Sequence, residues 1–403
     1  MSKRPSFVPS GWIITPLKEI CKRRSEPFDP SIDHATKPYI GLEHIASELH
    51  VLLGVGVSYE TVSLKAKFYK GDILYGKLRP YLNKVIQAKF DGVCSTEILP
   101  IQPKLEDDSN FVYLALQGKR YLDYAESMTA GTQHPRIGWR DIARYDIAIP
   151  KNHIEKLNIA ACFTTMERSI QATQASIAAA QKLKHALMQN LLTGKLKPDG
   201  TWRHDDEFDI DPKFGRIPKG WEMARVKDKF TSGRGRVINH EDIALAPGPY
   251  PVYSSQTSQN GVIGTVGFFE FEGEYITWTT DGANAGKVFF RSGRFCCTNV
   301  CGTLKGKAKV SHAYFALAID RVATRHVAVV GNNKLMNNVM GNIRVLAPRN
   351  PDEQAAIADS ILSIDHMVNQ KNGVLARKSR LKGALMQNLL TGKVRIPPNL
   401  IIE

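Results

Sequence analysis

The sequence of 403 residues has few of the features that mark a membrane or secreted protein. It contains no apolar run of roughly eighteen residues, the length that a membrane-spanning helix needs. Its first residues, MSKRPSFVPSGW, lack the apolar centre of a signal peptide. We therefore expect a cytoplasmic protein that makes no membrane contact.

Cysteine is also scarce and is not arranged as metal ligands. The six cysteines form no CxxC pair and show no zinc-finger spacing with histidine. Three of them lie in CCTNVC, residues 296–301, upstream of His312. Adjacent cysteines suit tetrahedral ligation poorly. We expect reduced cysteines that pack in the interior, with no metal and no cofactor bound by this chain.

Catalytic motifs of nucleic-acid enzymes are absent as well. The segments GANAGKV (282–288) and GTLKGKA (302–308) lack the spacing and the hydroxyl of a phosphate-binding loop. The chain has no Asn/Asp-Pro-Pro-Tyr/Phe tetrapeptide of the kind that amino-methyltransferases use. Asp91, Glu97 and Lys104 are only a loose imitation of a nuclease carboxylate set. The sequence therefore predicts a protein that binds without catalysing.

The chain does have an excess of positive charge. It contains 54 Lys and Arg against 39 Asp and Glu, for a net charge of +15. Basic residues that neutralise phosphates release condensed counterions, so such an excess suits a polyanion partner. Double-stranded DNA is the leading candidate, and a basic surface without a partner is the alternative. The length predicts two or three domains.

One thirteen-residue stretch occurs twice, as LKHALMQNLLTGK from residue 183 and as LKGALMQNLLTGK from residue 381, 198 residues later. The same offset aligns Glu155 with Glu353, so that about 46 residues repeat without a gap. Between the identical letters, apolar residues recur in steps of three, four and seven. This period is typical of one face of a helix.

Each copy predicts a helix of roughly 35 to 40 residues. Pro150 and Pro348 precede the two copies, and TGK at Thr193 and Thr391 supplies a glycine stop. A long helix with one apolar stripe must bury it. We expect the other copy to be the partner, in a coiled-coil-like antiparallel pair with pseudo-two-fold symmetry. The alternative is a surface helix packed on its own domain.

A second repeat places the domains, because VPSGW ends at Trp12 and IPKGW ends at Trp221. Each opens a block that alternates β-branched and aromatic residues with Gly and Pro breaks, as short strands do. Helical stretches follow at Phe111 to Tyr124 and at Ala313 to Val327, which makes both blocks mixed α/β. The Asp, Pro and Gly content of residues 197–215 suits exposed irregular chain. The predicted order is a first variable domain (1–149), a first repeated helix (150–195), a linker (196–219), a second variable domain (220–347), a second repeated helix (348–394) and a tail (395–403).

Polar loops in both variable domains carry the residue types that read bases. Arg and Lys reach guanine edges, and Asn and Gln pair with adenine. For each loop the alternatives are a solvated turn or a phosphate contact. The candidate DNA-binding residues are Lys77, Arg79, Lys84, Gln133, His134, Arg136, Arg140, Arg234, Arg236, Ser255, Gln256, Gln259, Asn260, Thr280, Asn284, Lys287, Asn332, Asn333 and Lys334.

The chain resembles the specificity subunit of type I restriction-modification systems over essentially its whole length. The resemblance rests on the GW openings, the GDIL segment, PRNPDEQAAIA from Pro348 with its degenerate copy PKNHIEKLNIA from Pro150, and the helix ends in LLTGK. The first copy has Glu-Lys where the second has Glu-Gln, a departure that concerns only one helix start.

The resemblance implies that the variable domains are target-recognition domains, each reading one half of a split DNA sequence, with the helices as a ruler between them. It also implies a non-catalytic subunit with two kinds of partner subunit: two methyltransferase subunits that use S-adenosylmethionine, and two restriction-translocase subunits that use ATP and Mg²⁺. The repeated helix ends would dock the methyltransferases, or else would only cap and pack the helices. The candidate docking residues are Leu187, Gln189, Asn190, Leu385, Gln387 and Asn388. A self-contained DNA-modifying enzyme and a helical scaffold for proteins are the rival readings.

Overall fold

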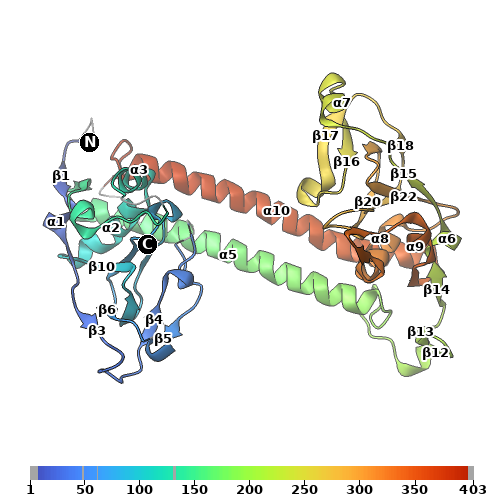
Figure 1. The fold of residues 1–403 in the computed structure, drawn as a ribbon, viewed down its shortest axis with the longest axis horizontal. Coiled ribbons are helices and arrows are strands. Elements are labelled where there is room, and N and C mark those ends of the chain that lie inside the picture. The colour runs from blue at the N-terminus through green and yellow to red at the C-terminus, as the bar shows by residue number, and fades with distance from the viewer. Residues whose placement is uncertain (1–7, 48–49, 61, 130–132, 398–403) are drawn as a thin grey trace. The chain divides into compact units, whose positions relative to one another are not determined.

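The computed structural model describes residues 8–47, 50–60, 62–129 and 133–397. The chain divides into two compact units (Figure 1). The first unit comprises residues 1–174 and 373–403, and the second comprises residues 175–372. Each unit therefore holds one α/β domain together with part of each long helix.

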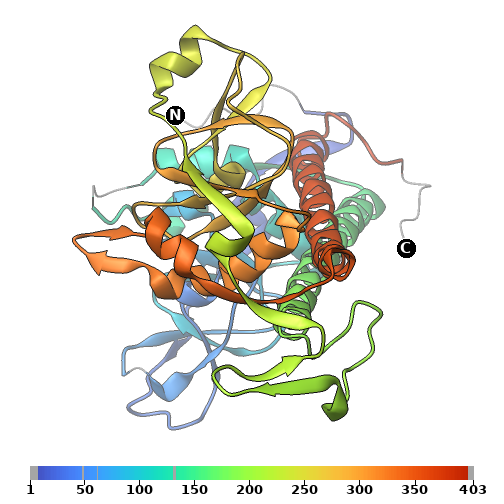
Figure 2. The same cartoon turned by 90° about the vertical axis from the view of Figure 1, so that its right-hand side faces the viewer.

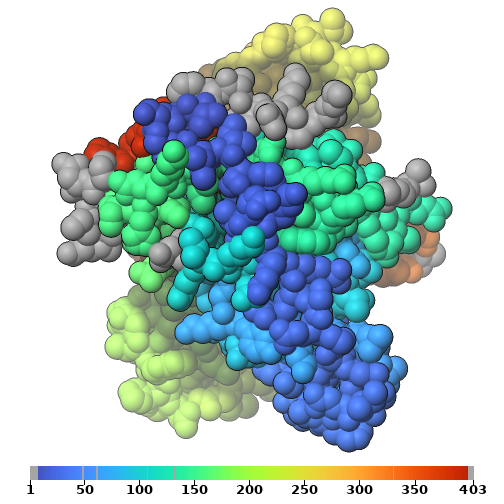
Figure 3. Space-filling model, turned by 90° about the vertical axis from the view of Figure 1, so that its left-hand side faces the viewer, coloured from blue at the N-terminus to red at the C-terminus, as the bar shows by residue number. Residues whose placement is uncertain are grey.

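The first domain is built on two sheets and a strand pair that leads into the long helix. β1 (Trp12–Pro16) pairs with β11 (Asp146–Pro150). The sheets have the strand orders β2-β10-β7-β8 and β3-β6-β9-β4-β5, and only β4 and β9 pair in parallel among the described strands of this domain. Their bounds are β2 (Cys21–Arg23), β3 (Pro27–Phe28), β4 (Pro38–Ile40), β5 (Gly56–Val57), β6 (Lys65–Phe68), β7 (Ile73–Gly76), β8 (Val85–Gln87), β9 (Gly92–Ser95) and β10 (Ile98–Pro103). In Figure 3 the early chain (dark blue) lies against the segment near residue 100 (cyan), as the β2–β10 pairing requires.

Short helices complete the first domain. They are α1 (Leu17–Ile20), α2 (Glu106–Gln117), α3 (Lys119–Ser127) and α4 (Trp139–Ile142), with 3-10 turns η1 (Leu42–His44), η2 (Ser58–Glu60) and η3 (Pro80–Leu82). The helical stretch predicted at 111–124 is therefore two helices. The chain breaks at Gly118, which has extended dihedral angles and serves as the N-cap of α3. Phe111 and Tyr121 on either side of the break are fully buried.

The second domain repeats the core of this topology, although its second sheet has four strands where that of the first domain has five, and it adds the strand pair β23–β24. β14 (Trp221–Arg225) pairs with β25 (Arg344–Pro348), and the sheets have the orders β15-β22-β19-β20 and β17-β16-β21-β18. β16 and β21 pair in parallel, as β4 and β9 do. The bounds are β15 (Phe230–Arg234), β16 (Tyr250–Tyr253), β17 (Val262–Val266), β18 (Phe271–Glu272), β19 (Tyr275–Thr279), β20 (Val288–Arg291), β21 (Arg294–Cys297), β22 (Cys301–Gly306), β23 (Ala328–Val330) and β24 (Asn332–Lys334). Its helices are α6 (Val226–Lys229), α7 (His240–Leu245), α8 (His312–Ala323) and α9 (Asn337–Asn342), with η5 (Ser258–Gly261) and η6 (Thr324–His326).

The two repeated helices are α5 (His153–Leu191) and α10 (Pro351–Leu389), of 39 residues each. Both end at the predicted glycines, since Gly194 and Gly392 have φ of 67° and 68°. A positive φ is costly for any residue with a Cβ, so glycine suits these stops. The predicted helices are confirmed.

Within each unit the helix halves pack against each other and against their own domain. In the first unit Lys382 donates to Glu167 at 2.8 Å and Lys378 donates to Thr173 at 2.9 Å, an antiparallel order. In the second unit Lys184 donates to Asp365 at 2.6 Å. The apolar stripe also enters the domain cores, where Ile159 and Phe163 of the first unit and Ile357 and Ile361 of the second are fully buried. The apolar stripe of each helix is thus buried both against the other helix and against the domain of its own unit. The predicted fold class is confirmed.

Each helix start is fixed by the same three residue types. In the first unit the Trp12 indole donates to Glu155 at 3.3 Å, and Arg395 donates to the other oxygen of Glu155 at 2.6 Å. In the second unit Trp221 donates to Glu353 at 3.1 Å, and Arg203 also donates to Glu353. Each arginine follows a glycine stop, so the chain beyond either helix end packs on the domain of its own unit.

The linker is more ordered than expected. Residues 197–215 were predicted to be irregular, but β12 (Phe208–Asp211) pairs with β13 (Gly215–Pro218) in a hairpin, after η4 (Asp205–Glu207). Figure 2, which faces the second unit, shows this hairpin in yellow-green. Asp211 accepts from the backbone N–H of Lys213 at 2.8 Å and of Phe214 at 2.9 Å. The Asp and Gly residues that suggested irregular chain form the hairpin turn instead.

Candidate nucleic-acid interface

Three loops meet at the end of the β7–β8 hairpin in the first domain. They are the loop 77–84, the turn 96–97 between β9 and β10, and the segment 133–138 before α4. The Lys77 N–H donates to the Glu97 carbonyl at 2.9 Å, and the Lys77 carbonyl accepts from Ile137 at 3.1 Å. The Arg79 N–H donates to the Pro135 carbonyl at 2.7 Å. We call these loops the first three-loop site.

The second domain builds the same framework from residues 280–287, 298–300 and 331–336, the second three-loop site. Thr280 donates to the Val300 carbonyl at 2.9 Å, and Leu335 donates to the Thr280 carbonyl at 2.8 Å. Gly282 donates to the Asn333 carbonyl at 3.0 Å. These bonds match those of the first site one for one, although the side chains differ. Position 77 thus corresponds to 280, 79 to 282, and 135 to 333.

An isolated β-bridge closes each site at the next position. It joins Leu78 to Arg136 in the first site and Asp281 to Lys334 in the second. Because the framework consists of backbone hydrogen bonds, it constrains the side chains little. A scaffold of this kind can hold a fixed loop geometry while the residues that face a ligand vary.

One carboxylate holds two basic side chains in each site. In the first, Glu97 lies 3.0 Å from Arg136 and 3.9 Å from Lys77. In the second, Asp281 lies 3.4 Å from Arg234 and 3.8 Å from Lys334. Neither carboxylate was predicted as a member of a site, because the prediction was based on hydrogen-bond donors in the loops. Their only signal in the sequence is their position within or beside the chosen loops.

Backbone strain gathers at the same loops. Among the described residues, five non-glycine residues have a positive φ, and four of them lie in or beside the three-loop sites. Arg79 and Asn83 flank η3, and Gln259 and Asn260 lie in the loop that Asn284 contacts through Ser255. Such conformations cost about 1–3 kcal/mol each and persist where the surroundings enforce them, often at functional sites.

Several candidate residues hold the loops in place. The Lys84 ammonium donates to the Leu42 carbonyl at 2.6 Å, Asn284 donates to the Ser255 carbonyl at 3.1 Å, and Gln256 donates to the Val262 carbonyl. Arg236 pairs with Glu270, and Lys287 pairs with Asp320 at 2.7 Å. The exposed candidates are Gln133, His134, Arg136, Arg140, Arg234, Arg236, Gln259, Asn260, Asn284, Asn332 and Lys334. The candidate Thr280 is fully buried, so its side chain does not face a ligand. The structure brings the candidates of each domain to one region, and their contacts with DNA stay a prediction.

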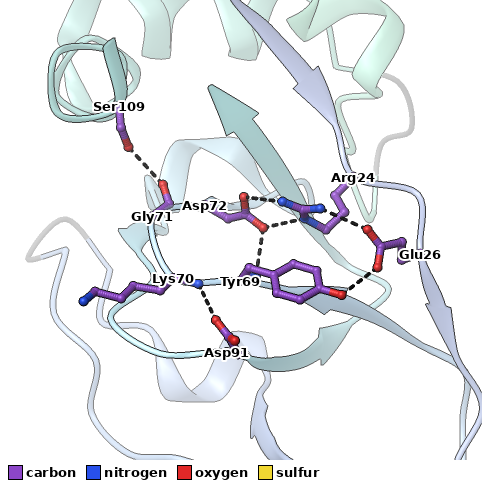
Figure 4. Close-up of polar contacts among 8 residues, drawn as sticks. All are labelled: Arg24, Glu26, Tyr69, Lys70, Gly71, Asp72, Asp91 and Ser109. Atoms are coloured by element: carbon purple, nitrogen blue, oxygen red, sulfur yellow. Dashed lines mark hydrogen bonds and ion pairs between the residues drawn. The ribbon is translucent and has the colours of Figure 1, made fainter. Parts of the chain in front are cut away.

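The GDIL segment positions the strand that carries the first site. Asp72 is buried and accepts from Arg24 at 2.7 and 3.1 Å, and from the Tyr69 N–H at 2.9 Å (Figure 4). Glu26 accepts from Arg24 at 2.9 Å and from the Tyr69 hydroxyl at 2.8 Å. The hydrogen bond to Asp72 raises the pKa of Arg24. The turn that precedes β7 is thereby fixed by a buried ion pair.

The repeated helix ends present the same side chains in both units. Leu187 and Leu385 pack against the cores. Asn190 donates to the Ala186 carbonyl at 2.9 Å, and Asn388 donates to the Ala384 carbonyl at 3.0 Å. Gln189 and Gln387 are exposed. In the first unit Met386, Gln387 and Thr391 line a groove of about 720 Å³ with Lys119 and Arg120 of α3.

The cysteines lie in the cores as free thiols. Cys296, Cys297 and Cys301 are buried, and burial raises the pKa of Cys301 to about 11. In the described part of the chain, no group of three or more His, Cys, Asp and Glu residues is placed to hold a metal. No helix among the described residues combines the length and apolarity needed to cross a membrane.

Comparison with known proteins points to one family. The family model described as type I restriction modification DNA specificity domain matches residues 9–182 and 218–376. The specificity subunit of the type I restriction enzyme MpnII from Mycoplasma pneumoniae is 37% identical over 152 residues, which are 37% of this chain and 45% of that protein. The EcoDI specificity subunit from Escherichia coli is 24% identical over 214 residues, 51% of this chain and 46% of that protein.

Solved structures share the fold. The crystal structure of a type I restriction-modification S subunit from M. genitalium superposes with a TM-score of 0.65 at 15% identity, covering 94% of this chain and 96% of that one. A structure described as showing complex assembly and conformational transition of the type I system gives a TM-score of 0.58 at 17% identity. The superposition covers 97% of this chain and 100% of that one. The sequence alignments with the first curated relatives span 36% to 63% of those proteins.

Proposed function

Because the chain belongs to the family of type I restriction-modification DNA specificity domains, we propose that it reads a bipartite DNA target within a type I complex. Each three-loop site reads one half of the target, and the two long helices set the gap between the halves. The observation that carries this proposal is the repeated loop framework with different side chains. A single backbone design that presents two sets of base-reading groups suits two half-sites of different sequence.

Recognition of the DNA is divided between contacts to its phosphate backbone and contacts to its bases. Basic residues at the rim of each site contact phosphates and set the register. In the first site these are Arg136 and Arg140. Side chains inside the loop framework contact base edges in the major groove, where each base pair shows its own donors and acceptors. The carboxylates Glu97 and Asp281 hold their basic partners ready in the absence of DNA, which lowers the entropy cost of binding.

The helix ends dock the methyltransferases. The polar faces at Gln189 and Gln387 are the same in both units and so offer two equivalent surfaces to two copies of one partner. The complex then holds two adenine-methyltransferase subunits and two restriction-translocase subunits. This chain binds no cofactor itself, while the partners use S-adenosylmethionine, ATP and Mg²⁺. Methylation and cleavage are carried out by those partners.

The test is to co-express the chain with a type I methyltransferase subunit and to map methylated adenines across the host genome. We expect one split motif with a fixed unspecified gap. A matched pair of chimaeras, in which residues 1–149 or residues 220–347 come from another family member, should each change only one half of the motif.

The rival readings give other results. Methylation by this chain without a partner would revive the self-contained enzyme. Complex formation without sequence-specific DNA binding would favour the scaffold. A chimaera that changed both halves of the motif would show that the domains do not read independently.

A further inference from the structure

Resting on the proposed function, we propose that the two three-loop sites read different bases: the first reads guanine through Arg79, and the second reads adenine through one of the neighbouring amides Asn332 and Asn333. The shared framework allows the side chains of the two sites to be compared position by position. What differs is which polar groups stay unpaired after the internal contacts are made.

Among the Lys and Arg side chains of the first site, the unpaired one is the Arg79 guanidinium. Glu97 occupies Arg136 and Lys77, and Lys84 is held by the Leu42 carbonyl. Two backbone hydrogen bonds fix Arg79: its N–H donates to the Pro135 carbonyl, and its carbonyl accepts from the Leu82 N–H. In the described part of the chain its guanidinium has no hydrogen bond or ion pair with another residue. The N–H donors of a planar guanidinium, held on a rigid loop, match the O6 and N7 acceptors of guanine.

The backbone of Arg79 supports this reading. Its φ of 52° is unusual for a residue with a side chain. At the equivalent position the second site has Gly282, with φ of 90°, which adopts such angles without strain. Glycine would therefore fit position 79 better than arginine does. The first site accepts backbone strain in order to present this side chain.

In the second site the basic groups are neutralised and amides are left. Asp281 pairs with Arg234 and with Lys334. Asn332 and Asn333 lie on β24, and within the described residues their side-chain amides have no hydrogen-bond partner. An asparagine amide matches the N6 donor and N7 acceptor of adenine. Neighbouring side chains of a strand point to opposite faces, so one of the two amides faces the bases. Gly282, at the position equivalent to Arg79, has no side chain and leaves room for that amide.

Two substitutions at position 79 separate base reading from phosphate binding. Arg79→Gly removes the side chain and relieves the strain, so the fold is kept. Arg79→Lys keeps the charge and loses the fork. The split motif is first determined for the unchanged chain in its methyltransferase complex and is then determined for each variant. Arg144→Gly in the same domain, on an exposed arginine in the turn after α4, is the matched control.

We expect both Arg79 variants to lose discrimination by about ten- to a hundredfold at one guanine of one half-site, with the other half unchanged. One of the two variants Asn332→Ala and Asn333→Ala should likewise lose discrimination at one adenine of the other half, and an effect of neither would overturn the assignment of the second site. Weaker methylation at all sites alike, with recovery in Arg79→Lys, would make Arg79 a phosphate contact and overturn the assignment. Loss of discrimination at a base other than guanine in the Arg79 variants would overturn the assignment too. If the unchanged chain shows no split motif, the proposed function is at fault rather than this assignment.

Discussion

At the scale of single residues, Asp72 shows how a buried charge fixes the approach to the first site. Its carboxylate is almost fully buried and accepts from two nitrogens of Arg24. Asp72→Asn keeps the shape and leaves the half-buried Arg24 with only the exposed Glu26 as its counter-charge, which costs about 1–3 kcal/mol. We expect this loss in the free energy of unfolding, measured by denaturant titration. The control is Asp91→Asn in the adjacent turn, which removes only an exposed contact to the Lys70 N–H and should cost less than about 1 kcal/mol. Equal losses in the two variants would contradict a special role for the buried pair.

Single residues also show why the sites were only partly predictable. The sequence placed Arg79, Asn332 and Asn333 in polar loops, because the residue types that read bases were visible there. The same search included Lys84 and Gln256, whose side chains hold loop carbonyls. Amides and ammonium groups satisfy a carbonyl of the chain as well as an acceptor on a base. Only the positions of the backbone carbonyls separate the two uses, and these are a property of the fold.

At the scale of elements, the repeated helices were predictable almost to their ends. The identical letters preserved the apolar phase, and Gly194 and Gly392 marked the stops. The hairpin in the linker was missed because neither strand alternates clearly: FDID has no buried residue, and GRIP buries only its last two residues. A strand pair of this kind depends on the turn at Asp211 more than on its hydrophobic pattern.

The helix pair gives a prediction about the gap between half-sites. Insertion of four residues after Gln174 in α5 and of four after Asn372 in α10 lengthens both helices by about one turn, or about 6 Å, and keeps the contacts inside each unit. We expect the gap in the methylated motif to widen by about two base pairs with both halves unchanged. The control is a four-residue insertion at Lys213 in the hairpin turn, which should leave the gap as it is. A change in either half-site would contradict the ruler.

At the scale of the whole molecule, the sequence predicted two domains of the same mixed α/β class, but their shared strand order and loop framework were beyond its reach. Outside the GW openings and the helices the letters have diverged, and the shared features are strand order and backbone hydrogen bonds. Many apolar sequences fill one sheet core equally well, since volume and pattern matter more than identity. The two domains could therefore keep one topology while their exposed loops changed. This is the arrangement that reading two different half-sites needs.

The net charge of +15 gives a prediction for the complete molecule. If both domains contact phosphates, roughly 6–10 contacts in all, the affinity for duplex DNA should fall about 10³–10⁵-fold between about 50 and 200 mM salt. Arg136→Gln, at the rim of the first site, should lower the slope of log affinity against log salt by about one. Arg216→Gln, on the β13 strand, removes the same charge from an exposed position remote in sequence from both sites and should leave the slope unchanged. Net charge alone would make the two variants equal, because each loses one positive charge. A difference between them would show that binding depends on where the charges lie, as a reader with two defined sites requires.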